Sequence, residues 1–244
     1  MKVVAIVQAR LASSRLPAKP LLDLGGATAL ERCLRRVRRF TGVDEVVVAA
    51  SDRPGAEILA RVAARAGVET VLGDEDDVLS RYAHAARYTH ADVVVRCTSD
   101  CPLLDPGVSS AVVAAFVADG AAAYASNTLD RALPRGLDTE VMSADALFAA
   151  ERDATERPAR EHVTWYLYQH PVRFRCLSVP TGRPDDLSRH RWTLDTLDDY
   201  RLLHAIFDRL GPRADDAGLD DVLDAVRRAP ALVGYNDDVA QKPS

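Results

Sequence analysis

The sequence predicts an α/β protein with three layers, in which helices cover both faces of a mostly parallel sheet. Two observations support this prediction. Short apolar runs of strand length alternate with longer stretches of helical periodicity through the first half of the chain. Polar and apolar residues alternate in "GLDTEVMS", in the second half, which predicts that antiparallel strands are added to the sheet there.

The elements of the first half follow one another in a regular order. Apolar runs predict strands at Val3–Val7, Glu45–Ala50, Glu69–Leu72, Asp92–Arg96 and Ala122–Ala125. Between them, Leu, Val and Ala recur at three- and four-residue steps and predict helices at Ala29–Phe40, Ala56–Ala66, Asp77–Tyr88 and Gly107–Asp119. Ligands of such sheets bind at the carboxyl ends of the strands, so the loops that follow the strands are candidate site segments.

The second half is predicted to add a small lobe that covers the substrate. Strands are expected at Gly136–Ser143, Val172–Val179 and His190–Asp195, and helices at Arg160–Gln169 and Asp198–Leu210. The loop Pro180–Arg189 is expected to be mobile, and Tyr235–Ser244 is expected to be a surface tail. The chain has no internal repeat and no low-complexity linker, which predicts a single domain over residues 1–244.

Composition limits the classes of protein to which this chain can belong. Its 244 residues carry a net charge of −5, which argues against a protein that binds nucleic acid through non-specific phosphate attraction. No apolar stretch approaches the ~18–20 residues that cross a membrane, and the first apolar run is too short for a signal peptide. The four cysteines, at positions 33, 97, 101 and 176, lack the spacing of a zinc site. We therefore expect a cytoplasmic protein with reduced thiols.

The loop after the first strand carries three cations among small residues: Arg10, Arg15 and Lys19. Backbone N–H groups of such a loop can converge on an anion, and guanidinium and ammonium groups add donors for phosphate oxygens. A triphosphate needs this combination, although neither GxxxxGK[ST] nor GxGxxG is present. The alternative is a solvated loop whose cations only keep the protein soluble.

The stretch "VQARLASSRLPAKPLLDLGG" resembles the N-terminal signature of nucleotidyltransferases that activate sugars with CTP, which include CMP-KDO and CMP-acylneuraminate synthetases. The signature is matched by Ala9, Arg10, Ser13, Arg15, Leu16, Pro17, Lys19 and Leu21. "RCTSDCPLLDP", "LPRGLDTEV" with "REHVTWYLYQHP", and "RWTLDTLDDYRLL" are similar to segments of the spore-coat polysaccharide-type cytidylyltransferases. The resemblance covers most of residues 1–210.

The resemblance implies a Rossmann-like (GT-A-like) nucleotidyltransferase fold with a small antiparallel lobe for dimerisation and acceptor binding. It divides the chain into a nucleotide-binding half (1–125), an acceptor and dimerisation lobe (126–190), and a closing strand with C-terminal helices (191–234). It also implies a homodimer. A triphosphate reaction of this type needs Mg²⁺, which prefers oxygen ligands and uses one or two carboxylates.

Two aspartates are candidate metal ligands. Asp100 follows a predicted central strand, and Asp195 follows "HRWTL"; by resemblance both positions carry metal. Asp195 has an alternative role as the N-cap of the next helix, and Asp105 is expected to cap the helix that begins at Pro106.

The remaining candidates are assigned partly by resemblance. Phosphate-stabilising catalytic groups are Arg10, Arg15 and Lys19. Nucleotide-binding residues are Gln8, Ala9, Arg10, Ser13, Ser51, Asp74, Ser80 and Asp100. "GDEDDVLSRY" departs from the base-binding pattern of CMP-KDO synthetases, and its acidic residues are alternatively a solvated helix start. Acceptor-binding residues are Asn127, Arg135, Asp138, Glu140, Arg160, Glu161 and His162; His162 alone has a structural role as the common alternative.

These residues predict transfer of a nucleotidyl group, with pyrophosphate as the leaving group, between a nucleoside triphosphate and a small-molecule acceptor. No convincing general base is present for an anomeric hydroxyl, which favours an acceptor that is already anionic, such as a phosphate or phosphonate. A guanylyl- or other nucleotidyltransferase acting on a sugar or cyclitol 1-phosphate is an alternative. Further alternatives are a non-catalytic nucleotide-binding protein and a glycosyltransferase-like module, although the Asp100 segment contains no DxD.

Overall fold

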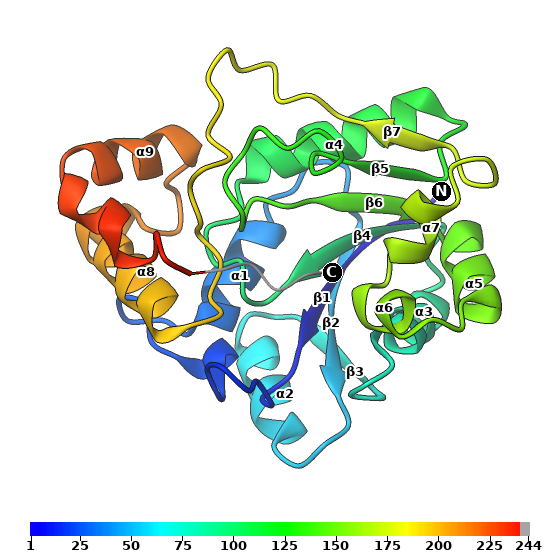
Figure 1. The fold of residues 1–244 in the computed structure, drawn as a ribbon. Coiled ribbons are helices and arrows are strands. Elements are labelled where there is room, and N and C mark those ends of the chain that lie inside the picture. The colour runs from blue at the N-terminus through cyan, green and yellow to red at the C-terminus, as the bar shows by residue number, and fades with distance from the viewer. Residues whose placement is uncertain (240–244) are drawn as a thin grey trace.

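A computed structural model describes residues 1–239 of the protein (Figure 1). Its strands form one mixed sheet in the order β3-β2-β1-β4-β6-β5-β7. Their bounds are β1 Val3–Ala9, β2 Glu45–Ser51, β3 Glu69–Gly73, β4 Val93–Thr98, β5 Tyr124–Ser126, β6 Glu140–Ser143 and β7 Cys176–Ser178. Strand β6 runs antiparallel to β4 and β5, and the other paired strands are parallel. The predicted mostly parallel sheet with an antiparallel addition is therefore confirmed.

Helices cover both faces of the sheet, as predicted (Figure 1). Along β1, Val3, Ala5 and Val7 belong to one core, and Val4 and Ile6 belong to the other. The first core includes α1 Ala29–Val37, α2 Ala56–Arg65 and α4 Pro106–Asp119, and the second includes α3 Val78–Tyr88, α5 Ala144–Asp153, α6 Arg157–His162 and α7 Trp165–Gln169. Because both faces are covered, the strand reads as a continuous apolar run rather than an alternating one.

A third core joins the C-terminal helices to the edge of the sheet where the strands end. It includes α8 Leu197–Leu210, α9 Leu219–Arg227 and the 3-10 segment η3 Pro230–Tyr235, which pack against Leu24, Leu103 and Trp192. The wholly buried Arg36 of α1 donates to the carbonyl oxygens of Leu104, Ala214 and Ala217. The helices therefore lie beside α1 at one end of the molecule (Figure 1). Two shorter 3-10 segments are η1 Lys19–Leu21 and η2 Gly211–Arg213.

The predicted strand at His190–Asp195 is wrong, and the strand predicted at Gly136–Ser143 shortens to β6. Residues 190–195 form only an isolated parallel bridge, between Arg191 and Arg135. Gly136 has a φ of 105°, and a Cβ there would lie 2.5 Å from the carbonyl oxygen of Trp192. The two segments thus cross at close range where only glycine fits, and a longer ladder does not form.

Three further predictions need correction. The helix predicted at Arg160–Gln169 is divided into α6 and α7 by Val163, which has a φ of 51°. Of the strand predicted at Val172–Val179, only β7 forms, and α5 was not predicted. The predicted tail Tyr235–Ser244 is wrong at Asn236, whose side chain is buried; residues 240–244 lie outside the described part of the chain. No helix within residues 1–239 is long and apolar enough to span a bilayer.

Candidate active site

A cavity of about 1110 Å³ lies at the carboxyl ends of β1 and β4. Its wall includes the loop after β1, the end of β4 and the amino end of β6, which reaches the same edge because β6 runs antiparallel. The segment from α6 to α7 supplies the opposite wall. The cavity therefore lies where the alternation of strands and helices predicted a ligand site.

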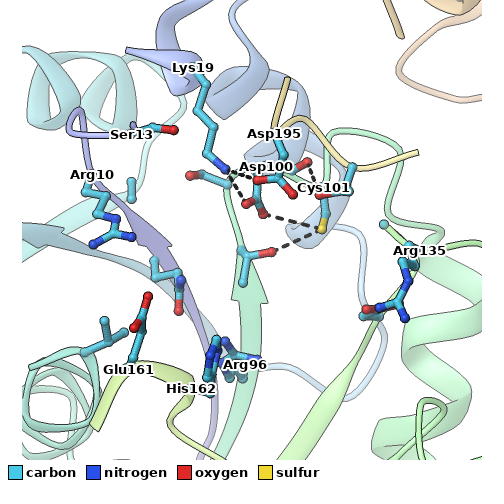
Figure 2. Close-up of a pocket in the computed structure, with 18 of the residues that line it drawn as sticks. Arg10, Ser13, Lys19, Arg96, Asp100, Cys101, Arg135, Glu161, His162 and Asp195 are labelled. Carbon is cyan, nitrogen blue, oxygen red and sulfur yellow. Dashed lines mark hydrogen bonds and ion pairs between the residues drawn. The ribbon is translucent and has the colours of Figure 1, made fainter. Parts of the chain in front are cut away.

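Lys19 extends into the cavity from one wall and bridges two carboxylates (Figure 2). Its Nζ lies 2.6 Å from Oδ2 of Asp100 and 2.7 Å from Oδ1 of Asp195. Local structure fixes the backbone before the lysine: Ala18 adopts the left-handed conformation and its N–H donates to the carbonyl of Leu11, which closes the loop before η1 begins. Asp100 and Asp195 are 95 positions apart in the chain, so tertiary structure brings them to one point.

The charges of this cluster stabilise one another. Burial disfavours the charged form of Asp100, but the Lys19 ammonium and hydrogen bonds outweigh burial and lower the pKa of the carboxyl to about 2. Burial also opposes the charge of Lys19, while Asp100 and Asp195 raise the pKa of its ammonium. Asp100 and Lys19 are therefore both charged near neutral pH. Two carboxylate oxygens around one cation are a donor set that a divalent metal also accepts.

The loop cations differ in their partners. Nη2 of Arg15 lies 3.2 Å from Oδ2 of Asp195. Arg10 forms no ion pair or side-chain hydrogen bond with another described residue, nor does Arg135, at the other end of the cavity. Figure 2 shows these two guanidinium groups on opposite sides of the Lys19 cluster. Among the described residues, the cavity thus offers one guanidinium group without an ion-pair partner on each side of Lys19.

A second charged cluster lies where β4 and β6 pair. Arg96 and Glu140 face each other in the strand register and form an ion pair. Glu140 also accepts hydrogen bonds from the hydroxyls of Tyr124, at 2.6 Å, and Thr164, at 2.5 Å. Burial opposes the charge of Glu140, but Arg96 and these hydroxyls lower its pKa below the ordinary value. Both members of the ion pair line the cavity and neutralise each other.

Glu161 and His162 project from the wall opposite Lys19 (Figure 2). The turn at Val163 orients this wall, because its positive φ ends α6 and brings Thr164 back to donate to Glu140. A β-branched residue in this conformation is strained, and strain of this type is concentrated at functional sites. Burial lowers the pKa of the His162 imidazole, so His162 is neutral near pH 7.

Near Arg135, the cavity wall carries a second neutralised cation. Arg131 Nη1 and Nη2 donate to the two carboxylate oxygens of Asp138 at 2.7 and 2.9 Å. This bidentate geometry opposes the charge of Arg131 with that of Asp138. On this side of the cavity, Arg135 is therefore the guanidinium group that can bind an anionic ligand.

The structure brings most predicted site residues to this cavity: Gln8, Ala9, Arg10, Ser13, Arg15, Lys19, Asp100, Arg135, Asp138, Glu140, Glu161, His162 and Asp195. Five others lie outside its lining. Ser51 donates to Glu75, which does line the cavity. Asp74 accepts the N–H groups of Asp76 and Asp77 in the turn before α3. Ser80 lies in the first turn of that helix.

Asn127 and Arg160 have structural partners instead. The amide of Asn127 bridges backbone atoms, donating to the carbonyl of Leu137 and accepting the N–H of Thr139. Arg160 forms an ion pair with Asp77, the N-cap of α3.

Several residues that line the cavity were not predicted from the sequence: Glu75, Arg81, Arg96, Arg131, Thr164 and Tyr168. Arg96 had a detectable signal, because it is a charged residue inside the apolar run "VVVRC" of a predicted central strand. Such a residue needs a buried partner, here Glu140.

Comparison with known proteins identifies the family. A model of the cytidylyltransferase family matches residues 4–206. The chain belongs to the cytidylyltransferase family. The predicted resemblance is thereby confirmed, and the protein is a nucleotidyltransferase. The spore coat polysaccharide biosynthesis protein SpsF of Bacillus subtilis (strain 168) is 30% identical over 93% of this chain and 95% of its own length.

Two further relatives support this membership. A 3-deoxy-manno-octulosonate cytidylyltransferase of Anaeromyxobacter sp. (strain K) is 34% identical, over 74% of this chain and 79% of its own. The structure of a cytidylyltransferase from Leptospira borgpetersenii serovar Hardjo-bovis (strain JB197) superposes with a TM-score of 0.90 at 27% identity, covering 100% of this chain and 99% of that one. The fold and the family thus agree over nearly the whole chain.

Proposed function

We propose that this cytidylyltransferase moves CMP from CTP to an anionic acceptor, a sugar-like acid, phosphate or phosphonate, and releases pyrophosphate. One arrangement carries the proposal: a Lys19 ammonium shared by Asp100 and Asp195, with Arg10 and Arg135 on either side. A triphosphate and an anionic acceptor bring several negative charges into the same cavity. These two guanidinium groups and Lys19 supply positive charge at the positions where these anions would meet.

The triphosphate would bind along the loop after β1. Arg10, Arg15 and Lys19 all line the cavity there, and they would stabilise the negative charge that grows on the leaving pyrophosphate. Lys19 uses two of its three N–H donors on Asp100 and Asp195, so it would donate the third to a phosphate oxygen or exchange a carboxylate for one. Membership of the family supports CTP as the nucleotide.

The cluster also fits a divalent cation. Lys19 Nζ stands where two carboxylate oxygens converge, and its contacts show that this point accepts positive charge. We propose that Asp100 and Asp195 hold Mg²⁺, which fits hard oxygen donors. When bound, Mg²⁺ would supply charge neutralisation on the phosphate oxygens.

The acceptor would bind between Arg135 and the wall that carries Glu161 and His162, with Asp138 and Glu140 in the same lining. Arg96 and Arg131 are already paired with carboxylates, so Arg135 supplies the attraction for an anion. The oxygen of an ionised acceptor would form a bond to the α-phosphorus as the bond to the bridging oxygen of the β-phosphate breaks. The electron pair leaves with pyrophosphate. Such an acceptor needs no general base, and the neutral His162 is available for its hydroxyl groups.

We further propose that the enzyme acts in the cytoplasm as a homodimer built through residues 126–190, with no nucleic-acid or membrane partner. Sedimentation of the purified enzyme at micromolar concentration tests the dimer. A species with the mass of one 26.5 kDa chain would contradict it.

Base choice is the first experiment, because it needs no knowledge of the acceptor. Thermal stabilisation with Mg²⁺ would be compared for CTP, GTP, UTP, ATP and dTTP, since ligand binding raises the melting temperature by mass action. We expect the largest shift with CTP. A larger shift with GTP would assign a guanylyltransferase, and no shift with any nucleotide would contradict the assignment of the basic loop.

Acceptor charge is tested by pyrophosphate release with phosphate monoesters, phosphonates, sugar acids and neutral sugars. We expect release with anionic acceptors. In Arg135→Gln, acceptor KM should rise about tenfold or more, because a hydrogen bond to a charged group is worth roughly 1.5–3 kcal/mol, while stabilisation by CTP should be retained. Arg61→Gln, on the exposed surface of α2, is the matched control. Equal release with neutral sugars, or an unchanged KM in Arg135→Gln, would contradict the proposal.

A further inference from the structure

A buried asparagine from the C-terminal segment reaches the back of the Lys19 cluster. Asn236 follows η3 directly, outside residues 4–206 that match the family model, and its side chain is 6% exposed. Its Nδ2 donates to Oδ1 of Asp199, at 2.8 Å, and to the carbonyl oxygen of Arg191, at 3.0 Å. Both donor hydrogens of the amide therefore have partners near Asp195.

Asp199 connects Asn236 to Asp195. Its carboxylate is wholly buried, and its Oδ2 accepts the backbone N–H of Asp195 at 3.0 Å and that of Thr196 at 2.9 Å. Its Oδ1 accepts Nε of Arg191 at 2.9 Å. Asp199 thus fixes the backbone of the turn that carries Asp195.

Arg191 completes the connection to the Asp195 side chain. Its Nη2 donates to Oδ2 of Asp195 at 2.8 Å and to Oδ2 of Asp199 at 3.2 Å. One guanidinium group is therefore divided between two carboxylates. Asn236 donates one of the hydrogen bonds that the Asp199 carboxylate accepts. Arg191 can therefore keep its Nη2 hydrogen bond to Asp195. Without Asn236, a buried carboxylate oxygen would lose a donor, and Arg191 would be the nearest group to compensate.

We propose that Asn236 is a positioning residue that acts through Asp199 and Arg191 to set the orientation of the Asp195 carboxylate, and with it the affinity for a divalent cation. This inference depends on the proposed role of Asp195 as a metal ligand. Partners of metal ligands affect affinity because they fix the ligand in the bonding direction, and their loss typically costs about 10- to 100-fold.

The test measures Mn²⁺ binding by electron paramagnetic resonance in the presence of CTP, together with the melting temperature of the metal-free protein. Asn236→Asp keeps the shape of the side chain but replaces the amide donors with a carboxylate that repels Asp199. Asn236→Leu keeps a similar volume and removes all polarity. Asp237→Asn, at the exposed next position, is the control. We expect Mn²⁺ affinity to fall about tenfold or more in both Asn236 variants, and to remain at the wild-type level in the control.

Each outcome has a distinct meaning. Weaker Mn²⁺ binding at a temperature far below the melting point of each variant supports the positioning role. A lower melting temperature with wild-type Mn²⁺ affinity overturns it and leaves Asn236 as a structural residue. If the wild-type protein itself binds no Mn²⁺ with CTP, the proposed metal site fails and the inference fails with it.

Discussion

Two charged clusters line the same cavity, are similarly buried and differ in how their charges are satisfied. The side chains of Asp100 and Glu140 are 23% and 10% exposed. Asp100 depends mainly on Lys19, a flexible ammonium that it shares with Asp195. Glu140 is held by a guanidinium and two hydroxyls from β4, β5 and the start of α7.

This difference indicates what each cluster can do. An ammonium on a flexible stem can leave one carboxylate and bind an arriving phosphate, so the Lys19 cluster can exchange partners. In the Arg96–Glu140 cluster, the donors are held by strands and by the start of a helix. These donors therefore stay with Glu140 instead of moving to a ligand. The same types of residue thus form an exchangeable site and a fixed support within one cavity. Four changes can break or sharpen this comparison.

The largest effect is expected at the exchangeable cluster. Lys19→Ala and Asp100→Ala should each abolish measurable turnover, a loss of at least about 100-fold, because we propose that Lys19 stabilises charge in the transition state and that Asp100 holds the divalent cation. The fold should remain intact, since Lys19 begins the short segment η1 and Asp100 follows the end of β4, both at the sheet edge. Steady-state pyrophosphate release and circular dichroism would measure the two properties, with Lys2→Ala at the opposite end of β1 as the control. Turnover near the wild-type rate in either variant would refute the assignment.

The fixed cluster should respond in stability. Arg96→Ala leaves the Glu140 carboxylate buried without its cation, and we expect the free energy of unfolding to fall by about 3–5 kcal/mol. Urea denaturation followed by fluorescence would measure the loss. In the double variant Arg96→Met with Glu140→Met, a large part of the loss should be recovered, because no unpaired charge remains. A loss below about 1 kcal/mol in Arg96→Ala would show that the ion pair is not a support.

The exchangeable cluster was predictable from the sequence, and the fixed one was not. Lys19 and Asp100 both follow apolar runs of a parallel sheet, whose strand ends meet at one edge, so topology alone places them together. Glu140 was predicted, but in an acceptor role. Its ion pair with Arg96 depends on the register of an antiparallel strand, which no local pattern specifies.

The wrong elements also have tertiary causes. "REHVTWYLYQ" contains neither glycine nor proline, so nothing in it predicts that Val163 ends a helix. Arg160 was expected in the acceptor site, but it forms an ion pair with Asp77 at the start of α3. The apolar alternation of Trp192 and Leu194 indicated a strand, but the chain crosses Gly136 instead of pairing along its length.

A smaller effect is expected from pH. The folded state lowers the pKa of Glu140, so the unfolded state binds more protons in acid and the contribution of Glu140 to stability is present above the ordinary glutamate pKa, about 4.3. It is lost as pH falls below that value. For Asp100, whose pKa is lowered to about 2, the same loss extends further into acid. In Glu140→Gln the contribution should be absent, so the stability difference from wild type should shrink as pH falls. A difference that is constant from pH 7 to pH 3 would contradict this expectation.

The smallest effect on stability is expected from the loss of a single hydroxyl group in each cluster. Thr164→Val removes one of three donors to Glu140 while keeping the shape of the side chain, and we expect a loss of about 1 kcal/mol in the free energy of unfolding. The matched change, Thr193→Val, removes a 3.3 Å bond to the backbone carbonyl of Asp100. It should cost less than about 0.5 kcal/mol, because the bond is long and its acceptor is neutral. If both changes lower the free energy of unfolding equally in urea denaturation, the hydrogen bond from Thr164 would contribute no more than a bond to a neutral acceptor, and Glu140 would depend on Arg96 and Tyr124.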